Sequence, residues 1–172
     1  MTASPHPIDD ALDRIVSAWA AGLGELPDHL GLDAEGFRAL IRWQFPTARV
    51  ASFRQPGRPI DPERAWEADD LTALLFAHRA GRDPRETWIA RIVSTGCLGS
   101  NHLWQDLALA SRTQLSGLLQ ACFPELVARN ARDMKWKKFL YRELCQSEGI
   151  YICRSPSCEA CDDYPVCFGP EE

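Results

Sequence analysis

The sequence predicts an all-α protein, with a single compact helical domain of about six to eight helices and a C-terminal cysteine-rich metal-binding loop. Apolar residues recur three or four positions apart through most of the chain, and no segment shows the sustained alternation of a β-strand. Capping residues, glycines and prolines mark helix starts and stops. A chain of 172 residues, 45% of them hydrophobic, is long enough for one domain with a real core.

Three segments are expected along the chain. Residues 1–7 are expected to be a disordered N-terminus, because they are short and rich in proline. Residues 8–148 are expected to form the helical domain. Residues 149–172 are expected to form a cysteine-rich, cluster-binding tail that packs on this domain.

The first half of the chain predicts four helices and one long loop. Asp33 and Asp61 are suitable N-caps, and the pair Asp83 and Glu86 matches a capping box. Residues 46–60 contain prolines and arginines without periodicity, which predicts a surface loop. The four predicted helices cover residues 8–21, 33–43, 61–81 and 83–96.

The second half predicts four more helices. Ser100 or Asn101 is expected to cap the first, and Ser111 with Gln114 matches a capping box for the second. Gly149 is expected to stop the last helix, and this places the helix C-terminus next to the tail in sequence. The predicted helices cover residues 100–107, 111–122, 124–130 and 134–148.

Four of the seven cysteines lie within the last twenty residues, spaced C-x4-C-x2-C-x5-C: Cys153, Cys158, Cys161 and Cys167. Thiolates are soft ligands that suit zinc, copper(I) and iron–sulfur clusters. The first three have the spacing of plant-type ferredoxins, whereas structural zinc sites use two close pairs separated by a longer stretch. We therefore favour an iron–sulfur cluster over zinc. Disulfides are disfavoured because the cysteine count is odd and no secretory signal is visible.

Other residues are candidates for the same site. Cys97 and His102 lie in a glycine-bearing turn at a helix start, where they could add one soft and one borderline ligand. Cys145 lies eight residues before Cys153 and is a further candidate, although it also fits a helix interior. Basic residues of the last helix either offset the charge of a cluster or form a solvated face: Lys135, Lys137, Lys138 and Arg142.

Several classes of function are disfavoured. The formal net charge of -5 argues against a non-specific nucleic-acid binder. The sequence contains no apolar run of about eighteen residues, so we expect no membrane span. No phosphate-binding loop, metalloprotease motif or nucleophile elbow is present, so we do not expect an enzyme. The acidic pair Glu171–Glu172 is expected to serve solubility or a partner contact. The expected compartment is the cytoplasm.

The sequence resembles the NifQ family, nitrogen-fixation proteins that supply molybdenum for the iron–molybdenum cofactor of nitrogenase. The resemblance rests on the cysteine spacing of the tail, on residues 134–142 (MKWKKFLYR) and on residues 101–107 (NHLWQDL). Together these motifs cover about the C-terminal half of the chain, and residues 1–60 add little.

The resemblance implies an iron–sulfur cluster of the [4Fe-4S] or [3Fe-4S] type that is convertible to a Mo-Fe-S cluster. It implies as partners the nitrogenase Fe protein and the scaffold on which the cofactor is completed, with no nucleic acid and no membrane. His102 or Cys97 is our candidate for the molybdenum-side ligand at one exchangeable corner. The implied cluster ligands are Cys153, Cys158, Cys161 and Cys167.

The sequence leaves two other classes of protein open. Helical DNA glycosylases of the endonuclease III type are similar in being all-α with a C-terminal cluster, but their spacing is C-x6-C-x2-C-x5-C. This chain has a four-residue first gap, no evident helix-hairpin-helix glycine motif and no basic balance. The other reading is a structural zinc module for protein interaction, which would be colourless and free of acid-labile sulfide.

Overall fold

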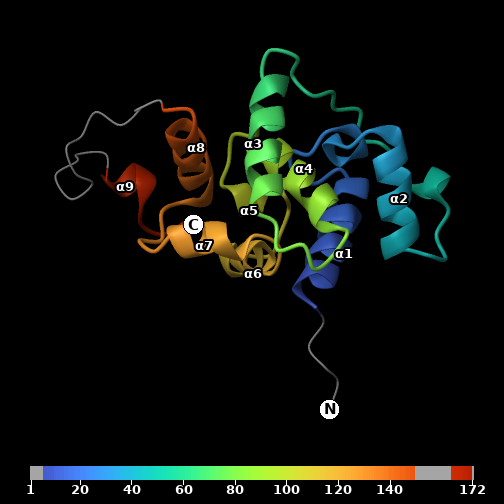
Figure 1. The fold of residues 1–172 in the computed structure, drawn as a ribbon. Helices are drawn as coiled ribbons and strands as arrows, with labels where there is room; N and C mark the ends of the chain where they lie inside the picture. Colours follow the sequence, from blue (N-terminus) through green and yellow to red (C-terminus); the bar gives the residue numbers. More distant parts are fainter. Residues whose placement is uncertain (1–5, 150–163, 172) are drawn as a thin grey trace.

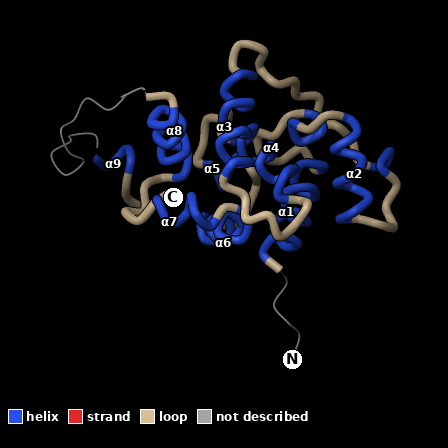
Figure 2. The backbone as a smooth tube through the Cα atoms, in the orientation of Figure 1, coloured by secondary structure: helices blue, strands red, loops and turns tan. Residues whose placement is uncertain are grey.

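The structure is a computed structural model that describes residues 6–149 and 164–171, and within these ranges the all-α prediction is confirmed. Figure 1 shows the order of the helices, and Figure 2 shows them joined by loops and turns, with no strand in either described range. The helices are α1 (Pro7–Ala20), α2 (Ala34–Gln44), α3 (Ala65–Ala77), α4 (Glu86–Gly96), α5 (Leu103–Asp106), α6 (Arg112–Cys122), α7 (Pro124–Arg129), α8 (Trp136–Ser147) and α9 (Tyr164–Cys167), with 3-10 turns η1 (Asp28–Gly31) and η2 (Val50–Ser52).

All eight helices expected from the sequence exist, and the described residues add α9, a single turn in the segment expected to be a loop. Pro165 fits this first turn because its missing N–H costs nothing there. The Tyr164 ring stacks on Phe168 with 4.5 Å between centroids, and the Phe168 N–H donates to the Tyr164 carbonyl at 2.9 Å. These local contacts stabilise the turn.

The core lies where the apolar faces of the helices meet. α3 packs along α4, α1 packs on α6, and α8 packs against α3. Figure 1 places α8 and α9 at one end of the molecule and α2 at the other. The largest fully buried side chains come from α1, α2, the junction of α6 and α7, and α8: Trp19, Phe37, Phe123 and Phe139. One continuous core therefore joins the N-terminal helices to α8.

Several of the predicted caps are confirmed by hydrogen bonds. The Asp33 carboxylate accepts from the Gly36 N–H at 2.7 Å, and the Ser111 hydroxyl accepts from the Gln114 N–H at 3.2 Å. The buried Glu86 carboxylate accepts from three backbone N–H groups of residues 81–83, at 2.7 to 3.1 Å. The Asp33 and Ser111 contacts start α2 and α6 where the sequence indicated. At α4 only the Glu86 half of the predicted capping box forms, because the N-cap is Arg85 and the Asp83 carboxylate accepts from the Arg85 N–H at 2.9 Å within the preceding turn.

Two predicted caps are wrong. Asp61 does not cap α3, because its carboxylate accepts from the Glu63 N–H at 2.9 Å within a separate turn, and α3 begins at Ala65. Neither Ser100 nor Asn101 caps α5; the cap position is His102, whose N–H donates to Gln105 Oε1 at 3.1 Å.

No helix in the described parts of the chain is both long and apolar enough to cross a membrane.

Candidate metal centre

Of the four tail cysteines, Cys167 is described and half-buried, whereas Cys153, Cys158 and Cys161 lie outside the described residues. Cys167 ends α9, and its carbonyl accepts from the Lys135 N–H at 2.8 Å. The Lys135 ammonium donates to the Pro165 carbonyl at 2.8 Å. Lys135 is the N-cap residue of α8, so the last cysteine is fixed beside the start of that helix.

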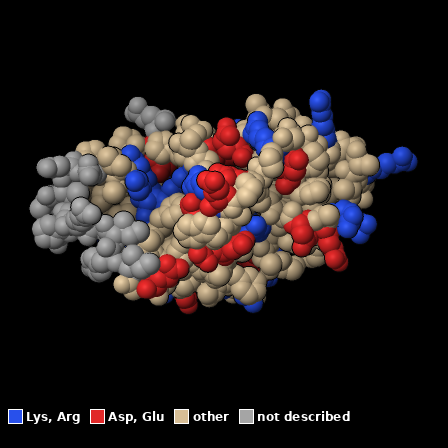
Figure 3. Space-filling view, turned by 90° about the horizontal axis from the view of Figure 1, so that it is seen from above, with Lys and Arg blue, Asp and Glu red and all other residues tan. Residues whose placement is uncertain are grey.

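The sequence suggested that the tail would face the C-terminal end of the last helix, where carbonyl groups disfavour an anion. The structure instead returns Cys167 to the N-terminal end of α8. Partial positive charge at a helix N-terminus favours thiolate and other anionic groups. Figure 3 also shows Lys and Arg side chains gathered over the end of the molecule that carries α8. The surroundings of Cys167 therefore favour a thiolate more than the C-terminal end of α8 would, which is the end next to the tail in sequence.

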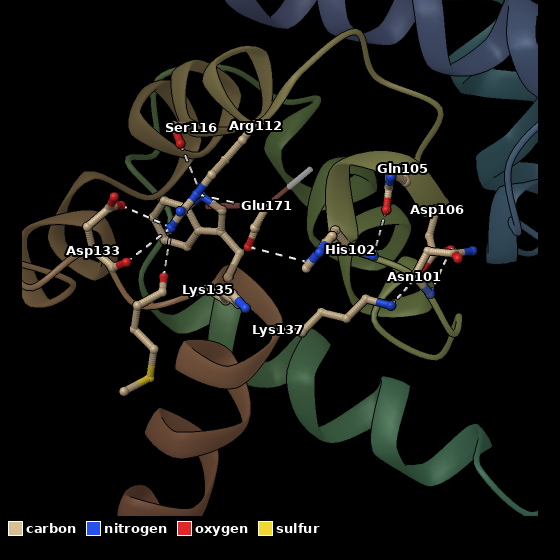
Figure 4. Close-up of polar contacts among 12 residues, drawn as sticks. Asn101, His102, Gln105, Asp106, Arg112, Ser116, Asp133, Lys135, Lys137 and Glu171 are labelled. Atoms are coloured by element: carbon tan, nitrogen blue, oxygen red, sulfur yellow. Dashed lines mark hydrogen bonds and ion pairs between the residues drawn. The ribbon is translucent and has the colours of Figure 1, made fainter. Parts of the chain in front are cut away.

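His102 lies at the start of α5, with 31% of its side chain exposed. Its Nδ1 atom is 3.9 Å from Oε1 of Glu171, a residue four positions after Cys167. The other carboxylate oxygen of Glu171 is 3.7 Å from Arg112 Nε. Figure 4 shows the Glu171 carboxylate between Arg112 and His102. The structure thus brings His102 against the segment that directly follows the last cysteine.

The turn that presents His102 is held by a buried ion pair. The Lys137 ammonium contacts the Asp106 carboxylate and also donates to the Gly99 carbonyl at 2.7 Å. Asp106 is fully buried and accepts from the Asn101 N–H at 3.2 Å and from Asn101 Nδ2 at 3.0 Å. A Cβ atom at Gly99 would lie 2.4 Å from an Asp106 oxygen, so only glycine fits this approach.

The other candidate sulfur atoms lie in or near the core. Cys97 is 2% exposed, and its burial raises the pKa of the thiol to about 12, an effect that the nearby Lys137 partly opposes. Cys145 is half-buried on α8, and burial raises its pKa as well. A metal ligand must be a thiolate, so burial works against both in this arrangement. A ligand role for Cys97 or Cys145 stays a prediction.

We expect these burial differences to appear as differences in reactivity. Burial also raises the pKa of Cys122 to about 12. At about pH 8 a thiol with this pKa is ionised in only about one molecule in ten thousand. Native metal-free protein should therefore alkylate at the half-buried Cys145 before Cys97 and Cys122, as measured by peptide mass spectrometry after iodoacetamide treatment. Labelling of Cys97 as fast as Cys145 would contradict the structure.

Two residues of this region, Glu171 and Arg112, were not identified from the sequence as site residues, and Lys137 was named only as one of several basic residues of the last helix. Glu171 was expected to serve solubility or a partner contact; its side chain is 2% exposed, so it is not a solvated surface charge, and a partner contact stays a prediction. Arg112 carried no motif, and Lys137 looked like its exposed neighbour Lys138. No local pattern could have singled them out, because their partners lie between 21 and 69 residues away. Among residues 6–149 and 164–171, no three or more His, Cys, Asp or Glu side chains are grouped to hold a metal ion.

These features define a small all-α protein. Its C-terminal segment contains α9, whose last residue is Cys167, and this segment packs against the start of α8. The family model described as NifQ matches residues 11–169. The chain belongs to the NifQ family, and this membership implies a role in nitrogen fixation.

Curated relatives cover most of the chain. It is 44% identical over 170 residues to "Protein NifQ" of Azotobacter vinelandii, covering 93% of this chain and 87% of that protein. It is 36% identical to "Protein NifQ" of Rhodobacter capsulatus over 88% of this chain and 82% of that protein. The corresponding protein of Klebsiella pneumoniae is 35% identical, over 92% of this chain and 97% of its own length. No solved structure gives a significant match.

Proposed function

We propose that this chain is an iron–sulfur and molybdenum carrier that supplies molybdenum for the iron–molybdenum cofactor of nitrogenase. In this proposal the cargo is an iron–sulfur cluster that also takes up molybdenum, and the acceptors are the cofactor-assembly scaffold and the nitrogenase Fe protein. The chain acts as a donor and not as an enzyme. The ligands in this proposal are Cys153, Cys158, Cys161 and Cys167.

The observation that supports this proposal best is the docking of the C-terminal segment. The Lys135 contacts fix Cys167 beside the start of α8, and Glu171 lies against His102. A cysteine, which offers a soft sulfur, and a histidine, which offers a borderline nitrogen, are therefore both tied to the segment formed by residues 167–171. Such a donor set suits iron and sulfide, and it leaves a weaker nitrogen position for exchange.

The chemistry of a carrier explains why a mixed ligand set is useful. Cargo must bind tightly enough for specificity and still leave when an acceptor is present. Thiolates supply the tight part of such a site. A histidine at 31% exposure can be displaced more readily than a buried thiolate, so we place ligand exchange at His102.

The direct test of donation is cofactor synthesis in a purified system. Anaerobically loaded protein is supplied as the only source of molybdenum to the assembly scaffold, the Fe protein and apo-nitrogenase. We expect nitrogenase activity to appear and molybdenum to move to the acceptor. The same amount of free molybdate with a chelator is the control. Activity that does not exceed this control would refute the role of donor.

The role of His102 is tested by its replacement. We expect His102→Ala to keep its iron and to lose molybdenum, because the nitrogen ligand of the exchangeable corner is removed. The matched control is His78→Ala directly after α3, where the His78 Nδ1 atom lies 2.9 Å from the Leu74 carbonyl oxygen. Iron and molybdenum per protein are measured for both variants. Unchanged molybdenum loading and donation in His102→Ala would remove His102 from the site.

A further inference from the structure

The Glu171 carboxylate is buried in an unusual setting. Its side chain is 2% exposed, and its Oε2 atom accepts no hydrogen bond within the described parts of the chain. Burying a carboxylate without hydrogen bonds is costly unless opposite charge lies close by. The neighbours that face it are Arg112 at 3.7 Å on one oxygen and His102 at 3.9 Å on the other. The burial of the Glu171 carboxylate therefore depends on Arg112 and His102.

Arg112 is held in place to meet this carboxylate. Its Nη2 atom donates to the Asp133 carbonyl at 3.2 Å, to the Met134 carbonyl at 3.1 Å and to Asp133 Oδ1 at 3.0 Å. Its Nε atom is the one that faces Glu171. A guanidinium is always charged, so Arg112 supplies a permanent positive charge on one side of Glu171. Figure 4 shows this arrangement, with His102 on the other side.

A negative charge on Glu171 favours hydrogen on the nitrogen of His102 that faces it. Nδ1 faces Glu171, and a lone pair on this atom would point at a buried negative charge. A hydrogen on Nδ1 turns this repulsion into attraction. In the neutral ring the other nitrogen, Nε2, then carries the lone pair. Metal-binding histidines commonly have this arrangement, with one nitrogen facing a carboxylate and the other on the metal.

We propose that Arg112 and Glu171 position His102 as a metal ligand through Nε2, and that docking of the C-terminal end is thereby coupled to occupancy of this ligand. The inference rests on the proposed function and adds to it the ligand atom and two positioning residues. Glu171 lies four positions after Cys167, and the buried Phe168 anchors the segment between them. One docked segment therefore delivers a cysteine and orients a histidine at the same time.

The first test needs no metal. Nitrogen-15 NMR of the metal-free protein, at alkaline pH where the ring is neutral, reports which nitrogen of His102 carries hydrogen. We expect hydrogen on Nδ1 in the wild type. Glu171→Ala should shift the population towards hydrogen on Nε2. Glu171→Gln should shift it at least as far, because its amide oxygen accepts from Arg112, which can only donate, and its NH2 group is left to donate to Nδ1. Glu148→Ala, an exposed residue after α8, is the control. A wild type with hydrogen on Nε2, or a Glu171→Ala spectrum identical to wild type, would overturn the proposal.

The second test uses loaded protein. Loss of a residue that orients a metal ligand typically lowers metal affinity by about 10-fold to 100-fold. We expect Glu171→Ala to lose molybdenum by about this factor in competition with a chelator, with iron content unchanged. Glu171→Gln should lose at least as much, because it favours hydrogen on Nε2, the proposed ligand atom. Equal molybdenum affinity in wild type and Glu171→Ala would overturn the positioning role. A wild type that takes up no molybdenum would instead refute the proposed function, and the NMR result would still decide the orientation of His102.

Discussion

Replacement of Lys137 by methionine is expected to lower the free energy of unfolding by about 3–5 kcal/mol. The reason is the fully buried Asp106, whose charge is compensated by the Lys137 ammonium. Methionine keeps most of the apolar stem of lysine but leaves the buried Asp106 carboxyl without its cationic partner. Urea titration of the metal-free protein, followed by circular dichroism, measures the change.

The adjacent residue gives a matched control. Lys138 is exposed on the same helix, so Lys138→Met should change the free energy of unfolding by no more than about 0.5 kcal/mol. Adding Asp106→Ala to Lys137→Met should recover part of the loss, because no unpaired charge then remains buried. Equal small effects of Lys137→Met and Lys138→Met would show that the Lys137–Asp106 pair does not hold the turn that presents His102.

The second large effect is expected for Cys167→Ala. Four-ligand zinc sites in small domains are worth about 10–16 kcal/mol. On the same scale one thiolate ligand contributes roughly 3 kcal/mol, about a 100-fold change in affinity. We expect anaerobic Cys167→Ala protein to lose iron and sulfide rapidly to a chelator. Visible absorbance and iron content over time measure this loss.

The control for Cys167→Ala is Cys122→Ala. Cys122 is fully buried on α6, so its thiol is a small core group and the variant should keep its cluster. The two variants remove the same atoms from one chain and differ only in place. Full retention of iron in Cys167→Ala, at the rate of wild type, would exclude Cys167 from the ligand set.

Local signals in the sequence predicted the helices well because their physical causes are local. Asp33 and Ser111 each accept a hydrogen bond from an N–H three residues later, and such contacts are visible in the order of residues. Asp61 misled because a turn offers the same donor groups, and its carboxylate serves the turn instead. Helix boundaries are consequently less certain than helix existence.

The candidate site was only partly predictable, because its remaining parts depend on tertiary contacts. Lys137 and Lys138 are adjacent lysines, and no local pattern in the sequence distinguishes them. Successive residues of a helix are rotated by about 100°, so only Lys137 points at Asp106. Glu171 is buried because α9 returns to the start of α8. Hydrophobic periodicity and capping residues cannot indicate such a tertiary contact. His102 was singled out from its glycine-bearing turn, and the structure adds its neighbours.

The central claim is that the C-terminal cysteines hold an iron–sulfur core together with molybdenum. It is tested most directly by iron, acid-labile sulfide and molybdenum analysis of anaerobically purified protein, with electron paramagnetic resonance. The comparison is a variant with Cys153, Cys158, Cys161 and Cys167 all replaced by alanine. We predict a brown wild type that contains all three components and a colourless variant that contains none. Wild-type protein without bound sulfide, or a variant with the full load, would contradict the claim.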